Sequence, residues 1–196
     1  MDPQVPPPAH LEATPRQMFG ELAQHIDEAT AAGICADLLS GADPRDYPTA
    51  FWYFGARGTE KFLAGTWGPD YWSRVWGARG LLYLWSDEVG GTVLAGLSDQ
   101  AWRVAEMCLK VAAKREVGGA GDGAVRLADH ELSRVRVAAL RVLAVVGDTE
   151  HLDVVTQRLN DPEPDVRRHA DRALLTMRER LDVVSPGRGP DGRTPW

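Results

Sequence analysis

The chain has 196 residues, of which 44% are hydrophobic, and this is enough to bury a full core in one domain. Its formal net charge of −6 argues against a protein dedicated to binding polyanions such as nucleic acid. The two cysteines, Cys35 and Cys108, are too few for a disulfide framework and favour a reducing compartment. No apolar run approaches the ~20 residues that a membrane span needs, and the first residues lack the apolar segment of a signal peptide. A cytoplasmic protein without membrane contact is therefore expected.

Both ends of the chain are predicted to be disordered tails. Residues 1–13 are rich in proline, and residues 182–196 are mostly proline, glycine and polar residues. Neither segment can bury enough apolar surface to offset the entropy that ordering costs. Residues 14–181 are therefore predicted to form a single domain.

The first helix of this domain is predicted to begin after Thr14. Thr14 as N-cap, Pro15 at the first helical position and Gln17 three residues after the cap form a capping-box pattern. Apolar side chains then recur at helical spacing. A second helical run is expected to end at the Ser-Gly pair of residues 40–41.

Most of the chain shows an internal repeat of about thirty-one residues. In each clear copy a short polar turn is followed by an anchor valine and then by small residues and leucines at helical spacing. The anchor valines Val104, Val135 and Val166 recur at the same interval. A period of this size with two helices per unit is typical of a solenoid, because only a neighbouring hairpin can bury the apolar face of each hairpin. The three clear copies cover residues 94–113, 125–148 and 156–177, and two weaker copies cover 36–55 and 61–85.

These repeats resemble the short bacterial HEAT-like repeats of the kind found in phycobilin lyases. The resemblance implies an all-α fold: a HEAT-like solenoid of about five helical hairpins in a right-handed superhelix, whose second helices form a concave surface. It leaves the function open, because such repeats serve as scaffolds for many activities. The residues that carry the resemblance in the last repeat are Leu159, Asp161, Pro162, Val166, Arg167, Ala170, Ala173 and Leu174, and their counterparts one repeat earlier are Leu127, Asp129, Val135, Arg136, Ala139, Val142 and Leu143.

The arginines of the repeats have two interpretations. In HEAT-like repeats the aspartate of the turn commonly pairs with the arginine after the anchor valine of a neighbouring unit. The resemblance therefore implies such pairing for Asp129, Arg136, Asp161 and Arg167. The alternative is a row of arginines that binds phosphates or acidic partners. The pairing is favoured, because residues 97–181 hold fourteen basic and fourteen acidic side chains.

Aromatic residues concentrate between positions 51 and 102. If residues 71–85 form one helix, successive side chains are rotated by ~100° per residue. One stripe of that helix then carries Trp72, Trp76, Arg79 and Tyr83. A second, apolar stripe on the same helix would face the core, and a solenoid helix needs only one such stripe. Either the helix buries both sides against neighbouring repeats, or the aromatic stripe is exposed. An exposed stripe could bind a partner or enclose a flat or cationic ligand.

No metal or cofactor is predicted. His130-Glu131 is similar to the histidine–glutamate pairs with which HEAT-like hydroxylases hold two irons, but those proteins need several pairs and this chain has one. His151 and His169 lack the partner at helical spacing that a metal site would use. These histidines are interpreted as surface residues near turns. The glycine-rich residues 118–123 lack the context of a phosphate-binding loop and are interpreted as a flexible connection.

The sequence favours a monomeric scaffold that binds a protein or peptide over an enzyme. The second helices are expected to present its binding surface, which consists of Trp72, Trp76, Arg79, Tyr83, Trp102, Arg136 and Arg167. Two alternatives stay open. One is an enzyme or ligand chaperone similar to the HEAT-like DNA glycosylases or lyases, although the net acidity does not favour nucleic acid. The other is a repeat protein that acts through self-association.

Overall fold

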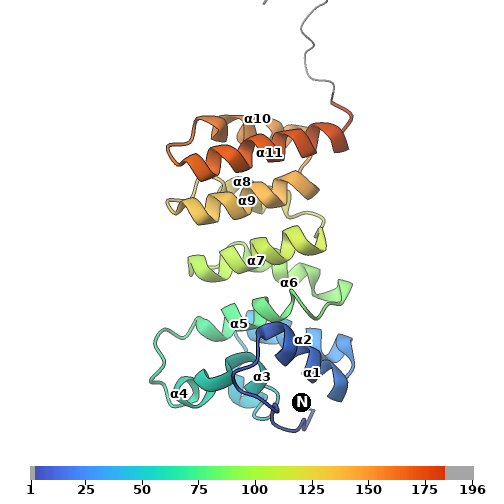
Figure 1. Ribbon diagram of the computed structural model, residues 1–196, viewed down its shortest axis with the longest axis vertical. Coiled ribbons are helices and arrows are strands. Elements are labelled where there is room, and N and C mark those ends of the chain that lie inside the picture. The colour runs from blue at the N-terminus through green and yellow to red at the C-terminus, as the bar shows by residue number, and fades with distance from the viewer. Residues whose placement is uncertain (1–2, 184–196) are drawn as a thin grey trace, which may run out of the picture.

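The computed structural model describes residues 3–183, and within these residues every regular element is a helix (Figure 1). The helices stack along one axis, with α1 to α4 at one end and α10 and α11 at the other. The predicted all-α solenoid is thus confirmed. None of the described helices is long and apolar enough to cross a membrane.

The hairpins differ in regularity along the stack. The first pairs α1 (Pro15–His25) with α2 (Glu28–Leu39), and the last three pair α6 (Gly90–Gly96) with α7 (Trp102–Arg115), α8 (Gly121–Leu127) with α9 (Ser133–Val146), and α10 (Leu152–Gln157) with α11 (Pro164–Arg180). Short 3₁₀ turns precede α6 and flank α10, at η3 (Asp87–Val89), η4 (Thr149–His151) and η5 (Arg158–Asn160). The second unit is irregular, with η1 (Pro44–Asp46), α3 (Trp52–Gly55), η2 (Ala56–Gly58), α4 (Thr59–Leu63) and α5 (Trp72–Gly80).

Two layers of helices follow from this arrangement. Helices α2, α5, α7, α9 and α11 pack successively against one another, while the shorter α6, α8 and α10 form the layer behind them (Figure 1). The anchor valines Val104, Val135 and Val166 are each the third residue of their helix and are fully buried. The repeat period therefore reflects one equivalent valine that is buried in each of α7, α9 and α11.

The predicted start of the first helix is confirmed. The Thr14 hydroxyl accepts a hydrogen bond from the Gln17 N–H, and the Gln17 side chain accepts one from the Thr14 N–H at 3.0 Å. Pro15 opens α1, where its missing N–H costs nothing. The end of the second helical run is also confirmed, because Ser40 caps α2.

Of the glycine-rich residues 118–123, interpreted from the sequence as a flexible connection, only 118–120 lie in the connection between α7 and α8. Helix α8 begins at Gly121, and both Gly121 and Gly123 are buried. A Cβ atom at Gly123 would lie 2.6 Å from Cδ1 of Leu97, so glycine allows α8 to approach the preceding repeat. Gly121 and Gly123 therefore serve close packing, whereas Gly119 adopts a positive φ of 80° in the turn before them.

The N-terminal segment differs from the disordered tail expected over residues 1–13. Val5 is buried, and its N–H donates to the Thr49 hydroxyl at 3.1 Å. The Pro6 carbonyl accepts a hydrogen bond from the Tyr53 hydroxyl at 3.0 Å. This segment therefore packs on the irregular second unit. Of the tail predicted over residues 182–196, positions 184–196 lie outside the described residues.

Candidate functional site

Trp76 belongs to the core and not to the surface. Its side chain is 5% exposed. Its ring lies within an aromatic cluster that joins α3, α4 and α5, at centroid distances between 5.2 and 6.2 Å from Phe51, Phe62, Trp67 and Trp72. Its predicted role as a surface anchor is therefore corrected, because Phe51, Phe62 and Trp67 of the preceding segments cover its face of α5.

Arg79 lies at the edge of this cluster and is partly buried. Its Nη2 donates to the Phe54 carbonyl at 2.8 Å, whereas its Nε has no hydrogen-bond partner within the described residues. Burial lowers the pKa of Arg79, because a charged guanidinium loses hydration there. A cavity of about 250 Å³ adjoins it, walled in part by Tyr53 and Trp67. Arg79 thus links α5 to α3 and keeps one N–H free.

Tyr83 does not continue the stripe of Trp72 and Trp76. Helix α5 ends at Gly80, so the predicted helix over residues 71–85 is too long and the expected stripe is interrupted. The Tyr83 ring stacks on Phe19 of α1, with centroids 5.6 Å apart and planes at 18°. Tyr83 therefore lines a separate pocket.

Trp102, Trp72 and two arginines form what we call the aromatic–arginine row. The Arg103 guanidinium lies 4.2 Å from the Trp102 ring centroid and 5.8 Å from that of Trp72. The Arg134 guanidinium lies 5.2 Å from the Trp102 ring. The row thus crosses α5, α7 and α9, and each of its members is partly or fully exposed.

The row carries a net positive charge. Glu106 is buried beneath it and receives hydrogen bonds from Arg134, with Nε 3.0 Å from Oε1, and an ion pair from Lys110 at 2.9 Å. Arg103 has no carboxylate partner within the described residues, and besides its ring contacts it hydrogen-bonds to the Tyr71 hydroxyl, at 3.4 Å. One carboxylate therefore faces three cations.

Arg136 forms the inter-repeat pair that the resemblance implied. Its guanidinium donates to both carboxylate oxygens of Asp161, at 2.8 and 2.7 Å, and also to the carbonyls of His130 and Glu131. Arg136 is 7% exposed, so its predicted place on the binding surface is corrected. Arg74 and Asp99 form an equivalent pair two repeats nearer the N-terminus. The two residues are again 25 positions apart, and the shortest distance between their side chains is 2.8 Å.

The middle repeat lacks such a pair, and this corrects the role predicted for Asp129. Asp129 is exposed and bonds to Arg158 at 2.9 Å. In this repeat the turn is stabilised by His130, whose Nδ1 accepts a hydrogen bond from the Leu132 N–H at 3.0 Å. Asp99 and Asp161 accept the equivalent N–H groups in their repeats.

Arg167 is exposed and occupies the position of Arg136 in the last repeat. Its Nη1 donates to the carbonyls of Asp161 and Pro162, at 2.7 and 3.0 Å, as Arg136 does one repeat earlier. It has no carboxylate partner within residues 3–183. Because the same contact occurs in two repeats, Arg167 helps to order the backbone of its own turn.

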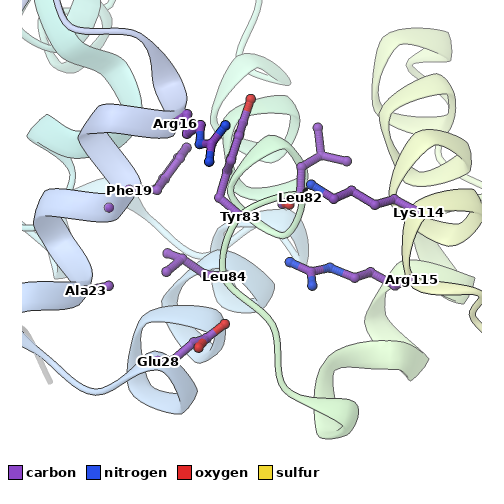
Figure 2. Close-up of a pocket in the computed structure, with 10 residues that line it drawn as sticks. Arg16, Phe19, Ala23, Glu28, Leu82, Tyr83, Leu84, Lys114 and Arg115 are labelled. Atoms are coloured by element: carbon purple, nitrogen blue, oxygen red, sulfur yellow. Dashed lines mark hydrogen bonds between the residues drawn. The ribbon is translucent and has the colours of Figure 1, made fainter.

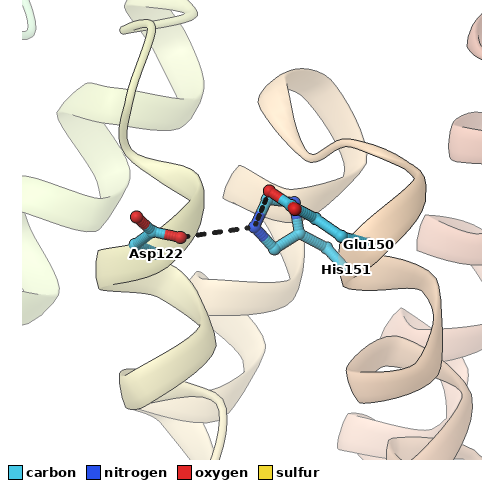
Figure 3. Close-up of side chains that lie close together, drawn as sticks. All are labelled: Asp122, Glu150 and His151. Carbon is cyan, nitrogen blue, oxygen red and sulfur yellow. Dashed lines mark ion pairs between the residues drawn. The ribbon is translucent and has the colours of Figure 1, made fainter.

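His151 was expected at the surface, but it is buried at the start of the last hairpin. Its Nε2 lies 3.7 Å from Asp122 and 3.8 Å from Glu150, so the three groups could in principle surround a cation (Figure 3). However, its Nδ1 accepts the Asp148 N–H at 2.7 Å. The proton of the neutral ring then lies on Nε2, which has no lone pair left for a metal. The group fits a hydrogen-bonded helix start and not a metal centre.

Residues 121–184 match the model of a protein family described as HEAT repeats. The match covers the last two hairpins, where the repeat pattern and the Arg136–Asp161 pair are clearest. No match to the chain was found among curated proteins. The family match supports a HEAT-like architecture.

The sequence interpretation missed Arg103, Arg134 and Glu106. A signal was present, because Arg103 and Arg134 both stand immediately before an anchor valine, Val104 or Val135. That position lies on the solvent side of the second helix in each repeat. A comparison of equivalent repeat positions would have brought the two arginines together.

Proposed function

We propose that this protein is a scaffold that binds an acidic peptide segment of a partner protein across its second helices. The observation that carries the proposal is that the guanidinium groups of Arg103 and Arg134 both lie over the Trp102 ring, at 4.2 and 5.2 Å from its centroid. HEAT repeats are commonly protein-interaction scaffolds, and the family match supports this class.

The chemistry of the row suits a carboxylate-rich ligand. Tryptophan and arginine dominate the residues that contribute most to protein interfaces. A guanidinium stacked on an aromatic ring keeps its N–H edge available for carboxylates. Because Glu106 already has two cationic partners, it offers little repulsion to an incoming acidic group.

The positive charge extends beyond the row along the same helices. Lys110 and Arg141 follow Arg103 and Arg134 by two helical turns, so they lie on the same faces of α7 and α9. Arg141 is exposed and contacts His169 at 3.1 Å, without a carboxylate partner within the described residues. An extended acidic segment could therefore contact α7 and α9 together.

The proposal is tested with a fluorescent 12-residue oligoglutamate peptide that carries one central leucine. Fluorescence anisotropy should show saturable binding to the wild type, and Trp102→Ala should weaken it by about tenfold. Arg178→Gln is the matched control, because Arg178 lies on α11 away from the row and has no ion pair within the described residues. Its affinity should equal that of the wild type.

Two outcomes would contradict this function. One is equal binding of the peptide by wild type and Trp102→Ala, with circular dichroism showing both folded. The other is tighter binding to a 20-base-pair DNA duplex than to the peptide, released steeply as salt rises, which would favour a nucleic-acid interface.

A further inference from the structure

A pocket of about 550 Å³ lies beside the C-terminal end of α7, at the opposite end of this helix from Trp102 (Figure 2). Its walls come from α1, from the start of α2, from the segment after α5 and from the last turn of α7. A pocket of this volume is within the usual range for a small-molecule ligand.

Three cations from two helices face this pocket. Arg16 extends from α1 beside Tyr83, while Lys114 and Arg115 extend towards it from α7 (Figure 2). None of the three has a carboxylate partner within the described residues. Glu28 is the one acidic side chain that lines the pocket, so its walls carry a formal charge of +2.

The two cations of α7 are held in place by backbone carbonyls. Lys114 Nζ donates to the Leu82 carbonyl at 2.6 Å, and Arg115 Nε donates to the Leu81 carbonyl at 3.2 Å. These bonds use one donor of each side chain. Lysine has three N–H donors and arginine has five, so further donors remain for a ligand.

One wall of the pocket is apolar; on it Leu82 and Tyr83 are partly exposed, and Lys114 Nζ lies 5.4 Å from the Tyr83 ring centroid. Tyr83 stacks on Phe19, and Leu84 lies next to them on the same wall (Figure 2). Glu28 is fixed at the margin, because its Oε1 accepts the Trp85 N–H at 3.1 Å. The pocket thus combines a cationic side with an apolar side.

We propose that this pocket binds an organic phosphate, a phosphate monoester with a small aromatic or apolar body. The phosphate dianion balances the charge of +2, and several N–H donors converging on one anion are the usual means of holding phosphate. The body of the ligand lies against Leu82 and the edge of the Tyr83 ring, which are both partly exposed in the lining. This ligand site does not depend on the peptide function proposed above, since it shares no residue with the aromatic–arginine row.

Isothermal titration calorimetry with phenyl phosphate at low ionic strength tests the site. The wild type binds phenyl phosphate, and Arg16→Gln weakens the affinity by about tenfold, which corresponds to one charge-assisted hydrogen bond. Arg16 is exposed and makes no hydrogen bond within the described residues, so this variant keeps the fold. Glu28→Gln keeps an acceptor for the Trp85 N–H but removes the negative charge, and it therefore binds phenyl phosphate more tightly than the wild type.

Controls separate the site from general charge effects. Arg178→Gln and Trp102→Ala bind phenyl phosphate as the wild type does, and inorganic phosphate binds more weakly than phenyl phosphate because it lacks the apolar body. The proposal is overturned if the wild type does not bind phenyl phosphate, or if Arg16→Gln and Arg178→Gln reduce the affinity equally. An equal affinity for inorganic phosphate would also overturn it, since the apolar wall would then have no part.

Discussion

Arg136 and Asp161 join the last two hairpins through two hydrogen bonds of 2.8 and 2.7 Å, with side chains that are 9% and 1% exposed. Removing one partner leaves the other charge buried without its ion-pair partner, which typically costs about 3–5 kcal/mol. We expect Arg136→Met to lower the free energy of unfolding by this amount in urea denaturation. The double variant Arg136→Met/Asp161→Leu should recover much of the loss. A loss below about 1 kcal/mol for Arg136→Met, the range of exposed ion pairs, would contradict this account.

The same pair makes stability depend on pH. Burial alone raises the pKa of Asp161, but hydrogen bonds from Arg136 and from the Glu163 N–H, with the charges of Arg136 and Arg158, outweigh it and lower the pKa below 3.8. The stabilisation is therefore fully present above the unfolded-state pKa and is lost as pH falls through the folded-state pKa. We expect the difference in unfolding free energy between wild type and Asp161→Asn to be constant from neutral pH to about pH 5 and to shrink below about pH 4. If the difference in unfolding free energy instead grew as the pH fell, the predicted pH dependence would have the wrong sign.

The middle repeat should accept an engineered Arg–Asp pair. Ala105 and His130 are separated by the same 25 residues as Arg136 and Asp161, and His130 already accepts the turn N–H as the aspartates do. Ala105→Arg alone places an unpaired cation at a position that is 2% exposed, so it should destabilise the protein. With His130→Asp added, a double-mutant cycle should show favourable coupling of about 1–3 kcal/mol. A coupling energy of zero would show that placing arginine and aspartate at these two equivalent positions is not enough to form the ion pair.

The solenoid could be predicted from the sequence because one buried position recurs in the last three repeats. Val104, Val135 and Val166 occupy the same buried position in three repeats. Because the pattern recurs at a fixed interval, it can be told apart from a chance arrangement of apolar residues. The start of α1 could also be predicted, because the capping box consists of hydrogen bonds between Thr14 and Gln17, which are close in sequence.

The candidate site was harder to predict because its members lie in different repeats. The stripe assumed on residues 71–85 required one helix, but the helix ends at Gly80 and the irregular second unit covers Trp76. No local pattern shows that Trp102 is left accessible. Likewise, the sequence around Gly123 does not indicate that this glycine packs against Leu97 of the preceding repeat.

Two glycines that both lie in helices should respond in opposite ways to alanine. At Gly77 a Cβ atom would lie 2.6 Å from the Cys35 carbonyl oxygen and 2.8 Å from the Leu39 amide nitrogen, so α5 would have to move away from α2. We expect Gly77→Ala to destabilise the protein by about 1–3 kcal/mol, as overpacked sites do. At Gly33 of α2 a Cβ atom meets nothing within 4 Å. Gly33→Ala should therefore stabilise the protein by about 0.5–1 kcal/mol through its helix preference. Thermal unfolding of both variants measures the contrast, and equal shifts would show that α2 and α5 do not pack as closely as their glycine contact requires.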